Sequence, residues 1–457
     1  MARLCALEVL KRGEGVDAVI SRAFAWLTRE HWLIGASLMR ISLGIWAVFF
    51  YLLHWRVRGL LWGPDGVLPY DKFLEASPVF NVFAFSGSPV YFEALYLLAI
   101  AIAILVVIGY KPRVMIPLHW LMTWSFQERN QLLGDGGDNL MRIVLLFLVA
   151  VNTGAYFSVS AGHRPAWPRW RMGMVHLWES AMGFLRPTLA VLHNIGVLLI
   201  LVQLSMLYMS TGLYKAMGEL WQNGTALYYI LRVDEFSWPG MAEIIYRSPY
   251  LVVLGTYGTV LFEVTFAPSL LNRWTRYATI VAGIAFHVGI ALFMGLVTFA
   301  WSLLGIYPLL LTDQEYRRAA AWLRDRLELT VFYDGWCPLC TTSVRRWSQF
   351  DLLSLIQFVS FREPGIIEVY GLDPAAAARR MLSITGRGRR HEGMDTLVGV
   401  AARAIVLWPV LPMLLAGRLV AGQRCYDAIA RRRMVLVPGA CQGGCPLGER
   451  PAAGPEG

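Results

Sequence analysis

Long apolar stretches recur along the first two thirds of this sequence, and they constrain its fold more than any other feature. A helix of about 20 apolar residues crosses the hydrocarbon core of a bilayer. The sequence has stretches of this kind at 33–53, 91–109, 114–126, 139–158, 188–211, 249–270, 277–295 and 297–312. Those at 114–126 and 297–312 are short enough to be tilted or re-entrant. We therefore predict a polytopic all-α membrane bundle with about six to eight transmembrane helices at 32–312.

The composition agrees with a chain that lies mostly in lipid. Of its 457 residues, 56% are hydrophobic and 16% are charged, whereas soluble domains are about half apolar and a quarter charged. The 18 tryptophans suit the two interfaces of a bilayer. The net charge of +10 is typical of cytoplasmic loops, and no nucleic-acid-binding motif accompanies it. The expected partner is therefore the lipid bilayer, and we expect no nucleic acid.

The charges between the apolar stretches predict an orientation. If residues 1–31 are cytoplasmic and every stretch crosses, the inner loops hold basic residues, namely Lys111, Arg113, Arg164, Arg169, Arg171, Arg186, Arg273 and Arg276. The outer loops then hold acidic residues, namely Glu128, Asp135, Asp138, Glu219, Asp234, Glu235 and Glu243. This distribution follows the positive-inside rule. We predict an integral protein of a bacterial inner membrane with the N-terminus and the C-terminal domain in the cytoplasm. A single crossing by 277–312 would place that domain outside.

The sequence changes character at both ends of the predicted bundle. Residues 1–31 lack the apolar core and cleavage site of a signal peptide, so we expect the first apolar segment to stay as an anchor. Residues 313–328 predict an Arg-rich amphipathic linker helix near the membrane surface. Residues 329–433 predict a small α/β domain, and residues 434–457 a loose Gly- and Pro-rich tail. Because IVLWPVLPMLLAG at 405–417 is short and split by two prolines, we expect it in the core of this domain.

A pair of cysteines lies at the start of the α/β domain. The segment Asp334-Gly335-Trp336-Cys337-Pro338-Leu339-Cys340 follows the predicted strand LTVFY and precedes a predicted helix at 341–350. A cysteine at a helix N-terminus faces unpaired N–H groups and the positive end of the helix dipole, and both favour the thiolate. The spacing places both sulfurs within disulfide reach. We predict that Cys337 attacks a disulfide and that Cys340 resolves the mixed disulfide.

Two other interpretations of this cysteine pair stay open, an inert structural pair and one half of a zinc site. A second pair, Cys441 and Cys445, would complete a four-cysteine zinc site. The looser spacing of the second pair and the position of the first pair between a strand and a helix favour a redox dithiol. We therefore expect no metal and assign no role to Cys441 and Cys445.

The region of the cysteine pair resembles the DCC family of thiol-disulfide oxidoreductases, named for its Asp-x-x-Cys-x-x-Cys motif. The resemblance covers about 329–433. It also includes Gly393-Met394-Asp395-Thr396 and Arg424-Cys425-Tyr426-Asp427, followed by Ala430-Arg431. It implies a thioredoxin-like α/β fold in which Asp334, Cys337 and Cys340 occupy the positions of the family motif.

Ionisable residues within the apolar stretches are the second group of candidates. Lys215, Glu263 and His287 lie in or beside predicted spans, where such groups are costly and mark functional sites. Lys215 is a candidate base. Plain structural explanations also exist. Lys215 can extend to the interface, His287 can be a hydrogen-bonded packing residue, and Glu263 can pair with Arg40 or Arg142.

The stretch from about 33 to 312 resembles the HTTM domain (horizontally transferred transmembrane domain), which includes the vitamin K-dependent gamma-carboxylase. The matching pieces are 40–44, 62–66, 137–142, 212–215, 221–227, Glu263 and His287. In the carboxylase, a lysine at the position of Lys215 is the catalytic base and a histidine near His287 lies in the active region. The resemblance implies these roles. This chain departs from the carboxylase where its membrane part passes directly into the dithiol domain.

Three functions are compatible with these features. The first is a membrane-bound thiol-disulfide oxidoreductase that acts with a quinone or a disulfide-containing protein as partner. The second is a carboxylase- or epoxidase-like membrane enzyme acting with a quinone that the dithiol re-reduces. The third is a non-enzymatic membrane scaffold or export accessory. A quinone is the candidate cofactor, and the sequence assigns no residue to its binding.

Overall fold

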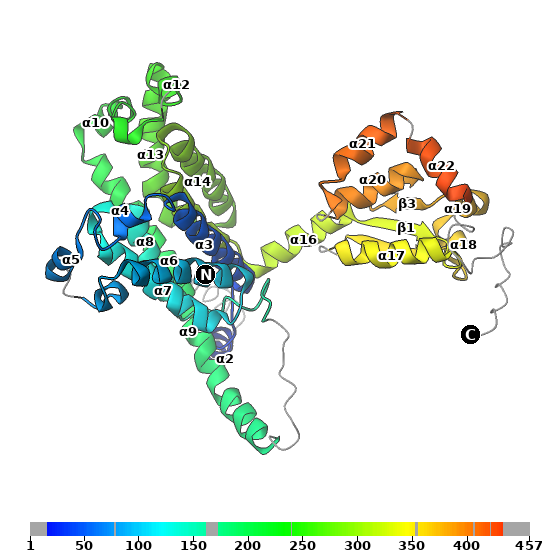
Figure 1. The fold of residues 1–457 in the computed structure, drawn as a ribbon, viewed down its shortest axis with the longest axis horizontal. Coiled ribbons are helices and arrows are strands. Elements are labelled where there is room, and N and C mark those ends of the chain that lie inside the picture. The colour runs from blue at the N-terminus through cyan, green and yellow to red at the C-terminus, as the bar shows by residue number, and fades with distance from the viewer. Residues whose placement is uncertain are drawn as a thin grey trace. The chain divides into compact units, whose positions relative to one another are not determined.

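The computed structural model divides into two units, residues 1–316 and 317–457. It describes residues 16–76, 79–160, 172–238, 240–351, 355–404, 407–420 and 422–432. The first unit is helical, and the second combines helices with a four-stranded sheet (Figure 1). Cys5, Cys441, Cys445 and the predicted tail at 434–457 lie outside the described residues.

The first unit contains fewer long apolar helices than the sequence predicts. Within the described ranges, five helices have the length and composition to cross a membrane, namely α3 (Leu33–Leu53), α6 (Pro89–Ile108), the part of α9 (Met172–Ala216) from Leu185, α13 (Pro249–Ser269) and α14 (Arg273–Met294). Several long apolar helices are typical of a membrane protein.

The other three predicted segments form shorter or more polar helices. They correspond to α7 (Pro112–Arg129), α8 (Gly136–Leu148) and α15 (Val297–Leu304) with η5 (Tyr307–Leu310). At a rise of 1.5 Å per residue, α8 is only about 20 Å long, less than the hydrocarbon thickness of a bilayer. The last turn of α7 carries Glu128 and Arg129, which lowers its hydropathy.

Short helices connect the long ones. They are α2 (Val16–Leu27), α4 (Arg58–Trp62), α5 (Tyr70–Ala76), η1 (Val82–Phe85), η2 (Gln131–Leu133), α10 (Glu219–Gln222), α11 (Ala226–Ile230), η4 (Asp234–Phe236) and α12 (Ala242–Tyr246). After η5, α16 (Asp313–Leu327) leads out of the first unit. The Asp313 carboxylate accepts hydrogen bonds from the backbone N–H groups of Leu33 and Ile34 at 3.1 and 2.8 Å. The end of the bundle thereby caps the start of α3.

One continuous core joins α3, α6, α7, α8 and α9. Arg40 lies in this core and is fully buried. Its guanidinium donates to the backbone carbonyls of Thr153, Val107 and Phe157 at 3.0, 2.7 and 2.6 Å. A buried cation that satisfies backbone carbonyls in this way has a structural explanation.

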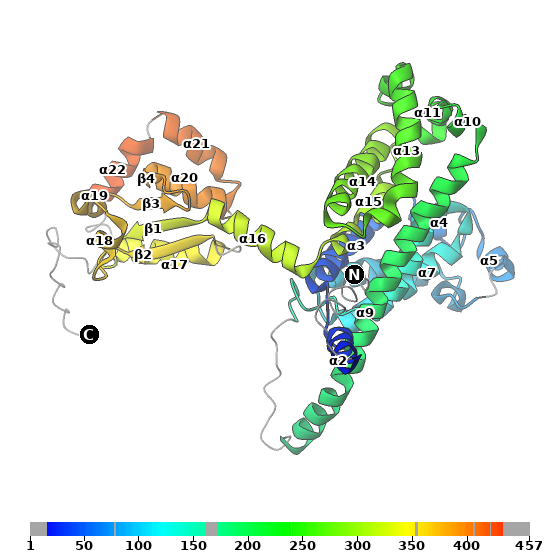
Figure 2. The ribbon, with the colours of Figure 1, turned by 180° about the vertical axis from the view of Figure 1, so that it is seen from behind.

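The second unit has the strand order β2-β1-β3-β4, as Figure 2 shows. β1 (Leu329–Tyr333) pairs in parallel with β2 (Ile356–Ser360) and antiparallel with β3 (Leu382–Thr385), which pairs antiparallel with β4 (Arg390–Glu392). Parallel strands need a crossover, and α17 (Pro338–Phe350) provides it. This small α/β arrangement is thioredoxin-like.

The remaining helices of this unit follow β2 and the β3–β4 hairpin. They are α18 (Ile366–Tyr370), α19 (Pro374–Arg379), α20 (Met394–Arg403), α21 (Leu411–Val420) and α22 (Gly422–Arg432). The α22 residue Asp427 pairs with Arg380, with an N–O distance of 2.7 Å, and Tyr426 Oη accepts from the N–H of Met381 at 2.9 Å. These contacts fix α22 against the start of β3.

The segment 405–417 was expected to form domain core. Of its described residues, Leu407 packs against the core, but most of the others do not. Trp408 is 55% and Met413 67% exposed. The core against β1 is instead filled by residues such as Val400 of α20, which packs with Val331 and Met381. Because α20 covers this face of the sheet, the apolar side chains of α21 lie largely on the surface.

Candidate active site

Cys337 and Cys340 lie where β1 passes into α17. α17 begins at Pro338, whose missing N–H would have no helical partner at that position. Cys337 is the N-cap residue, and its Sγ accepts a hydrogen bond from the backbone N–H of Cys340 at 3.4 Å. A hydrogen bond from a helix N-terminus stabilises a thiolate more than a thiol. The cysteine pair lies between a strand and a helix, as predicted, and Sγ of Cys337 is the sulfur that accepts the hydrogen bond at the helix N-terminus.

Both cysteines are buried, Cys337 completely and Cys340 with 6% of its surface exposed. A second sulfur must approach Cys337 directly during thiol–disulfide exchange. A protein disulfide therefore reaches Cys337 only after a local displacement of the residues that cover it. Exchange with a protein disulfide would therefore require the segment around the dithiol, which is ordered in the structure, to open locally.

Asp334, the first residue of the motif, is held in a buried ion pair with Arg362. Its carboxylate accepts from Nε of Arg362 at 3.0 Å and from Nη2 at 3.2 Å. The backbone N–H of Trp336 donates to the same carboxylate at 3.1 Å. The Arg362 guanidinium also lies 4.4 Å from the centre of the Trp336 ring. Asp334 and Arg362 together fix the turn that carries Cys337.

Arg362 was not among the site residues predicted from the sequence. A signal was present, because Asp334 follows β1 and Arg362 follows β2, and these strands are parallel neighbours. The carboxyl ends of parallel strands meet at the same edge of a sheet. Opposite charges just after two such strands therefore predict an ion pair at that edge.

Gly335 is required at its position by a close approach. A Cβ atom there would lie 2.4 Å from Oγ of Ser360 at the end of β2. A side chain larger than hydrogen would force the Ser360 side chain to move. This contact places the turn before Cys337 tightly against the end of β2.

Lys215, on α9 in the first unit, pairs with Glu263 on α13. Its Nζ donates to both carboxylate oxygens of Glu263 at 2.6 and 2.7 Å. Glu263 is 5% and Lys215 26% exposed at the side chain. The suggestion that Glu263 pairs with Arg40 or Arg142 is therefore wrong: Arg40 binds carbonyls, and Arg142 pairs with Glu128 at 2.8 Å. Glu263 can reach Lys215 because α13 and α9 pack side by side.

His287, on α14, is part of a second buried polar cluster. Its Nε2 hydrogen-bonds to the hydroxyl of Tyr208 at 2.6 Å, and that hydroxyl contacts the hydroxyl of Tyr307 at 2.9 Å. Nδ1 of His287 is buried and has no hydrogen-bond partner within the part of the chain that the structure describes. An unsatisfied buried nitrogen is uncommon and calls for an explanation such as a water or a ligand.

An apolar cavity of about 390 Å³ lies between α13 and α14. Phe262 and Phe286 line it together with glycines and aliphatic residues. The Phe262 ring contacts Tyr208, with 5.2 Å between ring centres, and the Phe286 ring contacts His287 at 5.0 Å. The cavity thus shares its wall with the His287 cluster.

The comparisons with known proteins identify the region around the dithiol. Residues 331–437 match the family of DCC1-like thiol-disulfide oxidoreductases. The chain is also 28% identical over 222 residues to the uncharacterized protein YitO of Bacillus subtilis (strain 168), over 47% of this chain and 65% of YitO. It is 26% identical over 202 residues to the sporulation-delaying protein SdpB of the same organism, over 43% of this chain and 57% of SdpB. No solved structure matches the chain.

Each of these matches covers only part of the chain. The alignments span less than two thirds of YitO and of SdpB. The DCC1-like match contains the whole sequence from Asp334 to Arg362, so it supports disulfide oxidoreductase activity for the second unit. The described residues contain no group of three or more His, Cys, Asp or Glu side chains that could hold a metal ion.

Proposed function

We propose that this protein is a membrane-bound thiol-disulfide oxidoreductase in which Cys337 is the attacking and Cys340 the resolving thiol. The observation that carries the proposal is the hydrogen bond from the N–H of Cys340 to Sγ of Cys337 at the start of α17. The DCC1-like match over 331–437 supports it independently. Long apolar helices in the same chain keep the dithiol at a membrane.

In the reductase direction, the Cys337 thiolate attacks one sulfur of a substrate disulfide. A mixed disulfide forms, and the other substrate sulfur leaves as a thiolate that takes up a proton. The Cys340 thiol loses its proton and attacks Sγ of Cys337, which releases the second substrate thiol. The substrate gains two electrons and two protons, and the enzyme is left with a Cys337–Cys340 disulfide.

A quinone in the first unit is our proposal for the membrane-embedded electron partner. The 390 Å³ cavity between α13 and α14 fits this class of molecule, because its lining is apolar and it is large enough for a substituted ring. In the reductase direction, the hydroquinone form would supply the two electrons and two protons that return the Cys337–Cys340 disulfide to the dithiol, and it would become the quinone. Tyr208 and His287 lie behind the wall of the cavity and would supply hydrogen-bonding groups for those protons.

We further propose that the dithiol faces the cytoplasm of a bacterial inner membrane. The basic residues at 111–113 and 273–276 support a cytoplasmic position for those loops. The contact of Asp313 with the start of α3 supports the same side of the membrane for both ends of the first unit. A reducing compartment keeps the resting dithiol reduced and favours the reductase direction. Labelling of single cysteines placed in the loop after α6 and in the second unit, with a reagent that does not cross membranes, tests the orientation. Labelling of the second unit from outside intact cells would contradict it.

The carboxylase- or epoxidase-like alternative depends on Lys215 as a base. Because both oxygens of Glu263 bind the lysine ammonium, Lys215 would become a base only if its proton passed to another group. Lys215→Ala tests this reading. Loss of a membrane-unit activity with unchanged turnover of the dithiol would favour the alternative over a purely structural ion pair.

Reduction of a small model disulfide by the full chain in detergent tests the oxidoreductase proposal. The Cys337→Ser, Cys340→Ser double variant is compared with Cys425→Ser, which leaves the motif intact. We expect the double variant to lose turnover and Cys425→Ser to keep it. Equal rates for the double variant and the parent would exclude the proposal and favour the scaffold or export-accessory alternative.

A further inference from the structure

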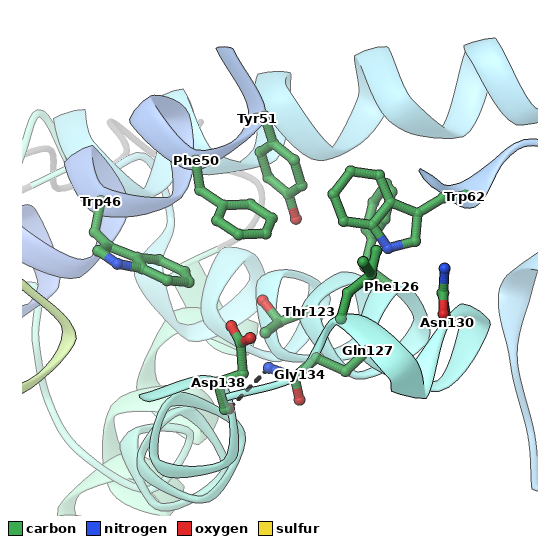
Figure 3. Close-up of a pocket in the computed structure, with 11 residues that line it drawn as sticks. Trp46, Phe50, Tyr51, Trp62, Thr123, Phe126, Gln127, Asn130, Gly134 and Asp138 are labelled. Atoms are coloured by element: carbon green, nitrogen blue, oxygen red, sulfur yellow. Dashed lines mark hydrogen bonds between the residues drawn. The ribbon is translucent and has the colours of Figure 1, made fainter. Parts of the chain in front are cut away.

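A second cavity in the first unit is lined by none of the residues of the dithiol site or of the Lys215 and His287 clusters. It is lined by residues of α3, α4, α7 and the start of α8, and its volume is about 40 Å³ (Figure 3). One water needs about 10–15 Å³ measured in the same way. The space therefore suits a molecule of a few non-hydrogen atoms.

Five of the eleven residues that line the cavity are aromatic. They are Trp46, Phe50, Tyr51, Trp62 and Phe126. The rings contact one another in sequence, with 5.3 Å between the centres of Trp46 and Phe50, 5.9 Å between Phe50 and Trp62, and 5.6 Å between Trp62 and Phe126. Aromatic faces are electron-rich and attract cations within about 6 Å of the ring centre.

A single carboxylate faces these rings. Figure 3 shows the carboxylate of Asp138 pointing into the space between Trp46 and Thr123, below Phe50. The backbone of Asp138 is fixed from two sides, because its carbonyl accepts from Nε2 of Gln127 at 2.8 Å and its N–H donates to Asp135 at 2.9 Å. The direction of the carboxylate is therefore set by the start of α8.

This carboxylate has no cationic partner within the part of the chain that the structure describes. The nearest arginines along the chain are engaged elsewhere, because Arg142 pairs with Glu128 at 2.8 Å and Arg129 donates to the carbonyl of Gly63 at 2.7 Å. Burial and the neighbouring Asp135 carboxylate raise the pKa of Asp138 to about 6. The carboxylate accepts the backbone N–H of Asp135 at 3.1 Å in the capping box of α8, but no cation among the described residues balances its charge beside the electron-rich rings.

We propose that this cavity binds a small organic ammonium ion, with Asp138 as its counter-charge and the aromatic rings as its walls. The ammonium group donates to the Asp138 carboxylate, and its alkyl part contacts Trp46 and Trp62. Thr123 and Gln127, which also line the cavity, offer oxygen acceptors for the remaining N–H groups. The volume selects amines of about two or three carbons.

Other occupants fit the lining less well. A divalent metal ion prefers several oxygen ligands and usually more than one carboxylate, whereas this cavity presents one carboxylate and the neutral side chains of Thr123, Gln127 and Asn130 beside its aromatic rings. A neutral apolar molecule would leave the carboxylate with the N–H of Asp135 but with no balancing positive charge, at the cost of its desolvation. An ammonium ion balances the charge of the Asp138 carboxylate and is attracted to the aromatic faces.

The test is calorimetric titration of the full chain in detergent with ethylammonium chloride, at pH 7.5 and constant ionic strength. Ethanol, a neutral molecule of the same size, is titrated in parallel. Asp138→Asn removes the charge while its amide oxygen still accepts from the N–H of Asp135, and Trp62→Leu removes one aromatic face. Asp234→Asn, in the exposed helix η4, is the matched control for loss of one negative charge.

We expect ethylammonium to bind the parent and Asp234→Asn equally, and ethanol not to bind. Asp138→Asn should weaken binding by about tenfold or more, as expected for loss of a charged hydrogen bond. Trp62→Leu should weaken it by about threefold or more, and it keeps the test decisive if Asp138→Asn fails to fold. Absence of binding by the parent, equal binding of ethanol, or unchanged affinity in Asp138→Asn would overturn the proposal.

Discussion

Replacing Arg362 with glutamine removes one partner of the buried ion pair beside the dithiol. At the side chain, Asp334 is 1% and Arg362 6% exposed, so solvent screens this pair very little. The variant leaves the Asp334 carboxylate buried with the N–H of Trp336 as a remaining donor. Removing one partner of a buried pair costs about 3–5 kcal/mol. Because the glutamine amide can still donate a hydrogen bond, we expect a loss of stability at the lower end of this range, about 3 kcal/mol.

This cost should appear as easier opening of the segment that covers the dithiol. A change of 3 kcal/mol corresponds to about two orders of magnitude in an opening equilibrium. The assay is native-state labelling of the full chain with a thiol reagent, followed by mass spectrometry of the peptide that contains Cys337 and Cys340. Since both sulfurs are buried, their labelling rate reports the opening directly. Arg362→Gln should be labelled about a hundredfold faster than the parent.

Two controls separate this effect from general destabilisation. Arg379→Gln removes an arginine of the same unit whose side chain is exposed and donates to the carbonyl of Ala375, and it should leave the labelling rate unchanged. Asp334→Asn combined with Arg362→Gln removes both charges and should recover at least half of the lost protection. Parent-like labelling of Arg362→Gln, or no recovery in the double variant, would refute the role given to the ion pair.

Two further outcomes follow from the geometry. Gly335→Ala should destabilise the dithiol segment by about 1–3 kcal/mol, because the new Cβ would lie 2.4 Å from Oγ of Ser360; unchanged labelling of the buried cysteines would contradict this. The affinity for ethylammonium should be constant above the Asp138 pKa of about 6 and fall as the pH drops through it, because protonation removes the counter-charge while the amine stays charged. A flat profile in the parent, or the same profile in Asp138→Asn, would count against that carboxylate.

The arrangement around the dithiol was predictable because it depends on local sequence. A β-rich run, a Gly turn, and a proline placed for the first helical turn predict the order of strand, cysteine pair and helix. The hairpin of β3 and β4 was not predicted, because the pairing of Leu382 with β1 is what makes it part of a strand. The ion pair of Asp334 with Arg362 depends on the same long-range pairing of strands.

In the membrane unit, the lengths of the apolar stretches predicted the helices. They did not predict which helices pack against each other. Lys215, Glu263 and His287 were recognised as unusual from their sequence surroundings alone. Which groups they contact depends on how α9, α13 and α14 pack, and the sequence does not contain that information in local form. The aromatic cavity shows the same limit, because Trp46, Trp62 and Asp138 come from three separate segments.

The central claim is that Cys337 attacks and Cys340 resolves, and trapping of the mixed disulfide tests it most directly. Cys340→Ser and Cys337→Ser forms of the full chain are held in native membranes, quenched with acid and alkylated, and adducts are located by mass spectrometry. With Cys340 absent, the mixed disulfide cannot be resolved, so adducts should accumulate on Cys337. The Cys337→Ser variant should carry few or no adducts on Cys340. Adducts on Cys340 in equal amount, or on neither cysteine, would contradict the proposed reaction.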